Sequence, residues 1–169
     1  VTRVTGRHLS GKTNADVEAL YILYNSNLKF VPQGMEQFFS NFEYLYFNEV
    51  GIEVLNGDEL NTYVNLRDFS LEWSYLERIS GDLFQNTPKI ELISFAFQEI
   101  SQIDVVLFST LDNLRVLDLR NNICIDRESG ESEEIQEIIN DVIESCSEMS
   151  TLTTTLATTT KSIMSTTVT

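Results

Sequence analysis

The chain has 169 residues, 42% of them hydrophobic, and a formal net charge of −15. This length and composition support one globular domain with a buried core. The excess of 26 acidic over 11 basic residues argues against binding to nucleic acid or to an anionic membrane surface, because both need a basic patch. No apolar run reaches the roughly 20 residues of a membrane span, so we expect no membrane insertion.

The first residues, beginning with Val1, have mixed polarity. We interpret them as the start of a processed or trimmed product, from which the signal peptide is missing. Residues 6–13, GRHLSGKT, match the phosphate-loop pattern G-x-x-x-x-G-K-[ST]. A phosphate loop follows a buried strand and opens a helix, whereas the residues after Thr13 enter a repeat in register. We therefore do not expect nucleotide binding.

Catalytic chemistry has little support in the chain. His8 is its one histidine, and no serine, cysteine or carboxylate lies at a spacing from it that indicates a catalytic triad or a related nucleophile. Two cysteines and one histidine do not complete a four-ligand zinc site. We expect a protein that is not an enzyme and that holds no metal or cofactor.

Five segments share apolar residues at their first, fourth and sixth places, and their starts are 25, 24, 24 and 24 residues apart. Apolar residues at the fourth and sixth places predict a strand with one face inward. One such strand cannot bury its face alone, so the five are expected to stack into a parallel sheet over a continuous core. The five triplets are Val17-Leu20-Ile22, Phe42-Leu45-Phe47, Leu66-Phe69-Leu71, Ile90-Ile93-Phe95 and Leu114-Leu117-Leu119.

The unit LRDFSLEWSYLERISGDLFQNTP, residues 66–88, resembles an extracellular leucine-rich repeat, and LRVLDLRNNICI, residues 114–125, resembles the last unit of such a protein. The opening HLSGKTNADVEAL and the ending NNICID are similar to short insect secreted leucine-rich proteins. The resemblance covers residues 17–125, and an edge strand in VTRVTGRHL would extend it to Val1. It implies an α/β fold, a leucine-rich-repeat solenoid with a curved parallel sheet of about five to six short strands and an irregular convex side. It also implies an extracellular protein.

The chain departs from the family at one position of the repeat. Leucine-rich repeats usually place an asparagine three residues after the sixth place, where its amide caps backbone groups along a ladder. Here Asn25 and Asn122 keep the asparagine, while Val50, Ser74 and Gln98 replace it. We expect the ladder at the two ends alone, and local irregularity near Val50, because its side chain cannot form a hydrogen bond.

Strand residues between the apolar places face outward and line the concave side of such a solenoid. We expect Tyr44, Tyr46, Trp73 and Phe97 to cluster in the middle of the sheet within a charged rim, which is a usual anchor for a protein partner. The competing interpretation is that Trp73 and Phe97, next to the strand ends, turn inward and pack against loops. The predicted partner-binding residues are Tyr21, Tyr44, Tyr46, Asp68, Glu72, Trp73 and Phe97.

Residues 124–148 depart from the repeat pattern and predict a C-terminal cap. Ser132 is a candidate N-cap with two glutamates behind it, and apolar residues from Ile135 onward recur at helical spacing. This amphipathic helix can close the open end of the core. Cys124 and Cys146 are either a disulfide, the more economical interpretation, or two free buried thiols. The acidic outer face of the helix is interpreted as a solvated surface.

The composition changes sharply after Glu148, since residues 149–169 are mostly Thr and Ser. Such a segment buries too little surface to offset its ordering entropy, which predicts a disordered tail behind a repeat domain at residues 1–148. Ser/Thr-rich segments also occur as O-glycosylated stalks, so both interpretations stay open.

The resemblance to leucine-rich repeats implies an extracellular recognition module that binds a protein partner with its concave face, and the lack of a catalytic motif makes us expect that it is non-catalytic. The alternative is a structural or coating glycoprotein with an O-glycosylated Thr-rich tail. A heterogeneous intact mass would favour that alternative.

Overall fold

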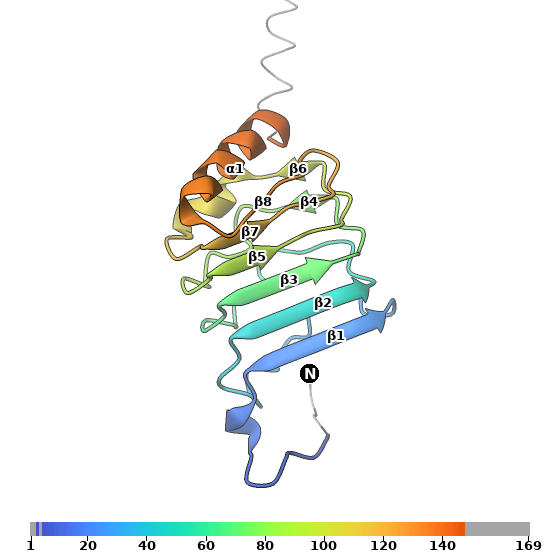
Figure 1. The fold of residues 1–169 in the computed structure, drawn as a ribbon. Coiled ribbons are helices and arrows are strands. Elements are labelled where there is room, and N and C mark those ends of the chain that lie inside the picture. Colours follow the sequence, from blue (N-terminus) through green and yellow to red (C-terminus); the bar gives the residue numbers. More distant parts are fainter. Residues whose placement is uncertain (1–2, 4, 148–169) are drawn as a thin grey trace, which may run out of the picture.

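The computed structural model describes residue 3 and residues 5–147, which form a solenoid (Figure 1). Successive turns contribute the five parallel strands β1-β2-β3-β5-β7, and β8 adds a sixth strand to the same sheet, antiparallel to β7. The strands of this sheet are β1 (Ala19–Asn25), β2 (Tyr44–Val50), β3 (Asp68–Glu72), β5 (Leu92–Ser94), β7 (Val116–Asp118) and β8 (Glu128–Ser129).

The return segments form the other side of the solenoid and are mostly irregular. A 3-10 helix, η1 (Asn14–Asp16), precedes β1, and a second one, η2 (Val105–Thr110), follows β6. β4 (Arg78–Ile79) and β6 (Gln102–Ile103) pair in parallel as a separate two-stranded sheet. The predicted α/β solenoid with a parallel sheet and an irregular opposite side is confirmed.

Strand pairing joins equivalent places of successive repeats. Leu45 pairs with Phe69, Phe69 with Ile93, and Ile93 with Leu117, so the fourth places form one row across the sheet. All four side chains are 0% exposed. A solenoid core is stable because each inward row is covered by the rows of both neighbouring repeats, which is why the apolar spacing in the sequence predicted it.

The middle of the core is aromatic. The ring of Phe69 lies 6.1, 5.8 and 5.7 Å from the rings of Phe47, Phe84 and Phe95, measured between ring centroids. Phe84 belongs to a return segment and the other three to the sheet side. This cluster therefore ties the two sides of the solenoid together over three consecutive turns.

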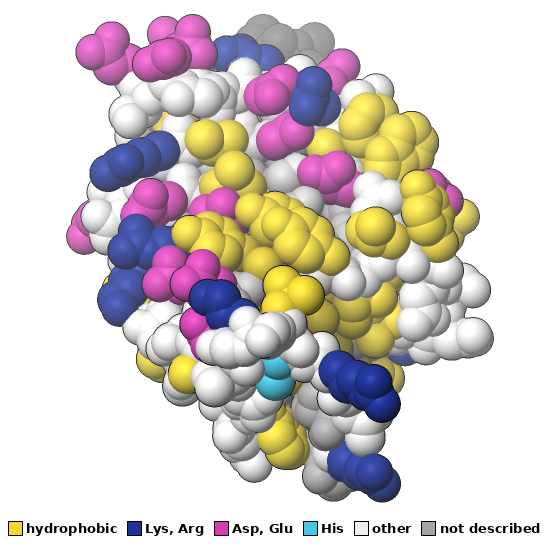
Figure 2. Space-filling model, turned by 60° about the horizontal axis from the view of Figure 1, so that its bottom comes forward, with side chains coloured by type: hydrophobic (Ala, Val, Ile, Leu, Met, Phe, Trp, Pro, Cys, Tyr) yellow, Lys and Arg dark blue, Asp and Glu magenta, His cyan; other side chains and the backbone are white. Residues whose placement is uncertain are grey.

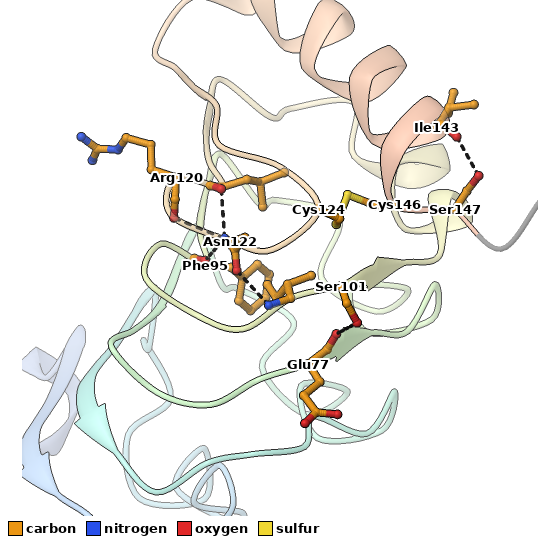
Figure 3. Close-up of a disulfide and its surroundings, with 11 residues drawn as sticks. Glu77, Phe95, Ser101, Arg120, Asn122, Cys124, Ile143, Cys146 and Ser147 are labelled. Carbon is orange, nitrogen blue, oxygen red and sulfur yellow. Dashed lines mark hydrogen bonds between the residues drawn. A yellow bond between two sulfur atoms is a disulfide. The ribbon is translucent and has the colours of Figure 1, made fainter. Parts of the chain in front are cut away.

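The asparagine ladder begins at the C-terminal end of the sheet. The side-chain amide of Asn122 donates to the carbonyl of Phe95 over 2.8 Å, and its Oδ1 accepts from the amide of Ile100 over 3.1 Å (Figure 3). Two backbone groups of the preceding repeat are satisfied in this way.

Gln98 takes the same role one repeat earlier, which corrects the expectation that the ladder survives at the two ends alone. Its Nε2 donates to the carbonyl of Leu71 over 2.9 Å, and its Oε1 accepts from the amide of Leu76 over 3.1 Å. A glutamine reaches the same pair of groups because its amide is identical and its stem is one methylene longer.

Ser74 makes a different contact with the preceding repeat, because its hydroxyl donates to the carbonyl of Val50 over 3.1 Å rather than to the carbonyl at the sixth place. The irregularity expected at Val50 is not observed, because this residue ends β2 and pairs there with Asn25. Asn25 does not reach across repeats. Its Oδ1 accepts from the amide of Asn27 in its own turn.

The N-terminal edge of the sheet is β1. The edge strand expected in residues 1–9 is absent from the described part of that segment. Leu9 is 81% exposed there, so it is not buried against the core. Lys12 forms an ion pair with Asp16 over 3.0 Å, and the Thr13 hydroxyl caps η1. The phosphate-loop pattern therefore leads into a three-residue 3-10 helix with its lysine already paired.

The C-terminal end is closed as predicted by a helix, α1 (Ser132–Ser145), whose buried residues are Ile135, Ile138 and Val142. A disulfide joins Cys124 to Cys146, with Cα atoms 5.2 Å apart (Figure 3). The predicted N-cap at Ser132 is wrong by one residue, because Glu131 holds this position without a side-chain bond. Within the described residues, no helix is long and apolar enough to cross a membrane. The Thr-rich segment 149–169 lies outside them.

Candidate partner-binding face

We use the term outward sheet face for the side chains that point away from the core on the six-stranded sheet and on the three residues that follow each of its strands. Strand pairing sets one row of this face, running across the strands in register, and this row changes from aromatic to polar along the solenoid. It consists of Tyr21, Tyr46, Ser70, Ser94 and Asp118.

Aromatic side chains on this face form two separate stacked pairs. The rings of Tyr21 and Tyr46 lie 4.7 Å apart between centroids with 7° between their planes. Trp73 and Phe97 lie 4.1 Å apart at 8°. We expected one cluster of Tyr44, Tyr46, Trp73 and Phe97. The structure instead pairs Tyr46 with Tyr21, and it leaves the half-buried Tyr44 outside both pairs.

Trp73 and Phe97 do not turn into the core, which removes the competing interpretation for this pair. Trp73 is 52% exposed and Phe97 is half-buried. Figure 2 shows hydrophobic side chains gathered across the middle of its view, with acidic side chains beside them. Exposed aromatic groups that already lie in fixed positions can bind a partner with little loss of side-chain entropy.

One backbone feature positions Trp73 and Phe97, and it recurs in every repeat. The second residue after the sixth place has a positive φ, in the left-handed region that residues other than glycine rarely adopt. Because successive repeats share this conformation, their side chains at this place leave the backbone in the same direction and can stack. The five residues are Tyr24 (φ 55°), Glu49 (51°), Trp73 (52°), Phe97 (57°) and Asn121 (54°).

The tyrosine pair is linked to a carboxylate. The hydroxyl of Tyr46 donates to Oδ2 of Asp68 over 2.9 Å. Burial, and next this hydrogen bond, raise the pKa of Tyr46 well above its usual value, so the phenol remains a proton donor. Burial also raises the pKa of Asp68, an effect that the bond from Tyr46 opposes and the charge of Glu91 reinforces. Burial likewise raises the pKa of Tyr44.

Glu72 is held between the two aromatic pairs. Its Oε1 accepts the hydroxyl of Ser70 over 3.0 Å and that of Ser94 over 2.7 Å. Ser70 pairs in register with Tyr46, while Glu72 directly precedes Trp73 on the chain. The two serines, although visible in the repeat register, did not enter our predicted site, because their role depends on the direction of the Glu72 side chain.

Arginines neutralise the carboxylates at the two sides of this face. Arg67 pairs with Glu43 over 3.1 Å and with Glu91. At the other side, Arg120 pairs with Asp118 over 2.7 Å and with Glu128 over 2.9 Å. The pKa of Arg120 is raised chiefly by its hydrogen bond to Asp118.

The described residues contain no group of three or more His, Cys, Asp or Glu side chains that could hold a metal ion. The outward sheet face thus offers planar aromatic surfaces, hydroxyl groups and carboxylates. These groups suit recognition of another molecule, and the fold that carries them is a leucine-rich-repeat-like α/β solenoid.

No protein-family model matches the sequence, and no curated protein matches it. Among solved structures, the chain is similar to Toll in the Toll–Spatzle complex, a molecular hub in Drosophila development and innate immunity, determined in a glycosylated form. The TM-score is 0.51 at 26% sequence identity, over 56% of this chain. The matched region spans 13% of the length of the Toll chain.

Proposed function

We propose that this chain is an extracellular, non-catalytic module that recognises a protein partner with its outward sheet face. The observation that carries the proposal is the Trp73–Phe97 stack, with centroids 4.1 Å apart, in which Trp73 stays 52% exposed although it lies beside a second outward aromatic pair, Tyr21–Tyr46. Tryptophan and tyrosine are the residues that most often dominate binding energy at protein interfaces.

The likeness to Toll supports the same proposal, because that protein is seen in complex with another protein. The disulfide between Cys124 and Cys146 supports an extracellular location, since disulfides persist mainly in oxidising compartments. The proposed interface consists of the seven residues predicted from sequence, extended by Ser70 and Ser94, which orient Glu72.

The test uses the full chain as bait for secreted proteins, with the captured partner identified by mass spectrometry, purified and titrated. The variant Tyr46→Ala with Trp73→Ala removes one ring from each aromatic pair. The matched control, Phe30→Ala with Val106→Ala, removes side chains that are 64% and 59% exposed on the return segments.

We expect the first double variant to weaken binding at least a hundredfold and the control to leave it unchanged. Both variants are checked by circular dichroism and urea unfolding. A partner that binds both variants as tightly as the original chain would refute the outward sheet face as the interface.

A further inference from the structure

The charges on the outward sheet face are unevenly balanced. Glu43, Glu91, Asp118 and Glu128 all have arginine partners. Asp68 and Glu72 lie between these groups, and no ion pair within residues 5–147 includes either of them. Their side-chain oxygens accept hydrogen bonds from hydroxyl groups, which orient a carboxylate without neutralising it. The nearby arginine charges, Arg67 for Asp68 and Arg120 for Glu72, act on them from beyond ion-pair distance.

One oxygen of the Glu72 carboxylate is left for a group of the partner. Its Oε1 takes both serine hydroxyls, and no hydrogen bond in the described chain involves its Oε2. A carboxylate that is fixed through one oxygen presents the other in a defined direction. Arginine binds this group through paired N–H donors, and lysine binds it as a point charge.

The two aromatic pairs lie at a spacing that an extended chain can span. Two strand spacings and three residues separate their centres, a diagonal of about 14 Å for strands ~4.8 Å apart with a rise of ~3.3 Å per residue. About four residues of extended chain cover this distance, and residues i, i+2 and i+4 of such a chain point to one side. The side chains at i and i+4 then meet the aromatic pairs. The position i+2 lies over β2 and β3, about one strand spacing from the Glu72 carboxylate at Ser70 and Ser94, a gap that a long arginine or lysine side chain can span.

We propose that the partner presents an extended segment with an arginine or lysine that pairs with Glu72 between the Tyr21–Tyr46 and Trp73–Phe97 stacks. This inference rests on the proposed function and names the chemistry of the partner at the same face. Aromatic faces attract cations through the ring quadrupole, which favours the same side chains. The net charge of −15 steers a basic segment toward the protein before contact.

Trp73 is the one tryptophan of the chain, so its fluorescence reports on this site directly. The probes are three peptides, capped at both ends, of sequence GFSRSFG, GFSQSFG and GFSESFG, which absorb little where tryptophan is excited. Each is titrated into the full chain, into Glu72→Gln and into Glu77→Gln. Glutamine keeps an oxygen that can accept the hydroxyls of Ser70 and Ser94, while Glu77 is an exposed glutamate next to β4.

We expect the arginine peptide to bind the original chain and Glu77→Gln at least tenfold more tightly than the glutamine peptide, and the glutamate peptide most weakly. In Glu72→Gln the advantage of arginine should fall to about twofold or less, and added salt should reduce it in the original chain. Equal affinity for the three peptides, an arginine preference that survives in Glu72→Gln, or no response of Trp73 to any peptide would overturn the inference.

The peptide titration tests the basic segment, whereas the partner titration tests the interface itself. If all three peptides perturb Trp73 equally, aromatic recognition stands and the basic segment does not. If a captured protein partner binds the Tyr46→Ala and Trp73→Ala double variant normally, the interface itself is elsewhere.

Discussion

Trp73 and Phe97 stack face to face although both carry a positive φ, 52° and 57°. The left-handed conformation costs a residue other than glycine or asparagine about 1–2 kcal/mol. The same conformation at the same place in successive repeats is what brings the two rings within 4.1 Å of each other. The strain and the exposed aromatic surface therefore have one origin.

This origin predicts an unusual response to substitution at Trp73. Asparagine tolerates the left-handed region, whereas a β-branched residue does not. We expect the free energy of unfolding, measured by urea denaturation, to be about 1–2 kcal/mol larger for Trp73→Asn than for Trp73→Val. Both variants lose the stack equally, so similar stabilities would contradict a role for backbone strain.

Gln98 should be important for stability despite its polar side chain. In Gln98→Leu the carbonyl of Leu71 and the amide of Leu76 both lose their partner, and each unsatisfied buried group costs about 1–3 kcal/mol. We expect the free energy of unfolding to fall by at least about 2 kcal/mol. Gln136→Leu, on the exposed side of α1, serves as the control and should change it little.

The disulfide should hold the C-terminal cap in place. Cys124 and Cys146 are 22 residues apart, and closing a loop of this length contributes about 3 kcal/mol in the chain-entropy model. Replacing both with serine should lower the unfolding free energy by about that amount and reduce the helical signal of α1 first on heating. If reduction and the double serine variant leave the melting curve unchanged, the helix is held by packing of Ile135, Ile138 and Val142 alone.

Asp68 should make stability depend on pH in the direction opposite to that of a salt-bridged carboxylate. Its pKa is raised above the ordinary 3.8, mainly by burial, so the folded state binds this proton more tightly than the unfolded chain does. Ionisation therefore costs folding free energy as pH rises through the raised pKa. The substitution Asp68→Asn keeps an oxygen that can accept the bond from Tyr46 and removes the charge.

We accordingly expect the stability of the original chain relative to Asp68→Asn to fall as pH is raised from about 3 to about 7. The measurement is urea denaturation of both proteins across this range. A difference that stays constant, or that grows in favour of the original chain, would show that the carboxylate is not penalised in the folded state.

The repeat, the parallel sheet and the closing helix follow from the sequence because they depend on the spacing of apolar residues. A period of 24 residues places equivalent side chains in one row, whatever the details of each turn, and hydrophobic burial depends on area rather than on direction. The disulfide pairing could be expected on a different ground, because the chain has two cysteines and hence one possible pair.

The tertiary structure decided which outward residues meet. Pairing of Tyr46 with Tyr21, and of Glu72 with Ser70 and Ser94, depends on side-chain direction and on the left-handed turn after each strand, neither of which leaves a spacing pattern in the sequence. The sequence also did not predict that Gln98 replaces asparagine in the ladder, because hydrogen bonding requires two groups to meet at a given distance and angle. Apolar periodicity therefore determined the solenoid, while directional contacts between repeats determined the face that we propose binds a partner.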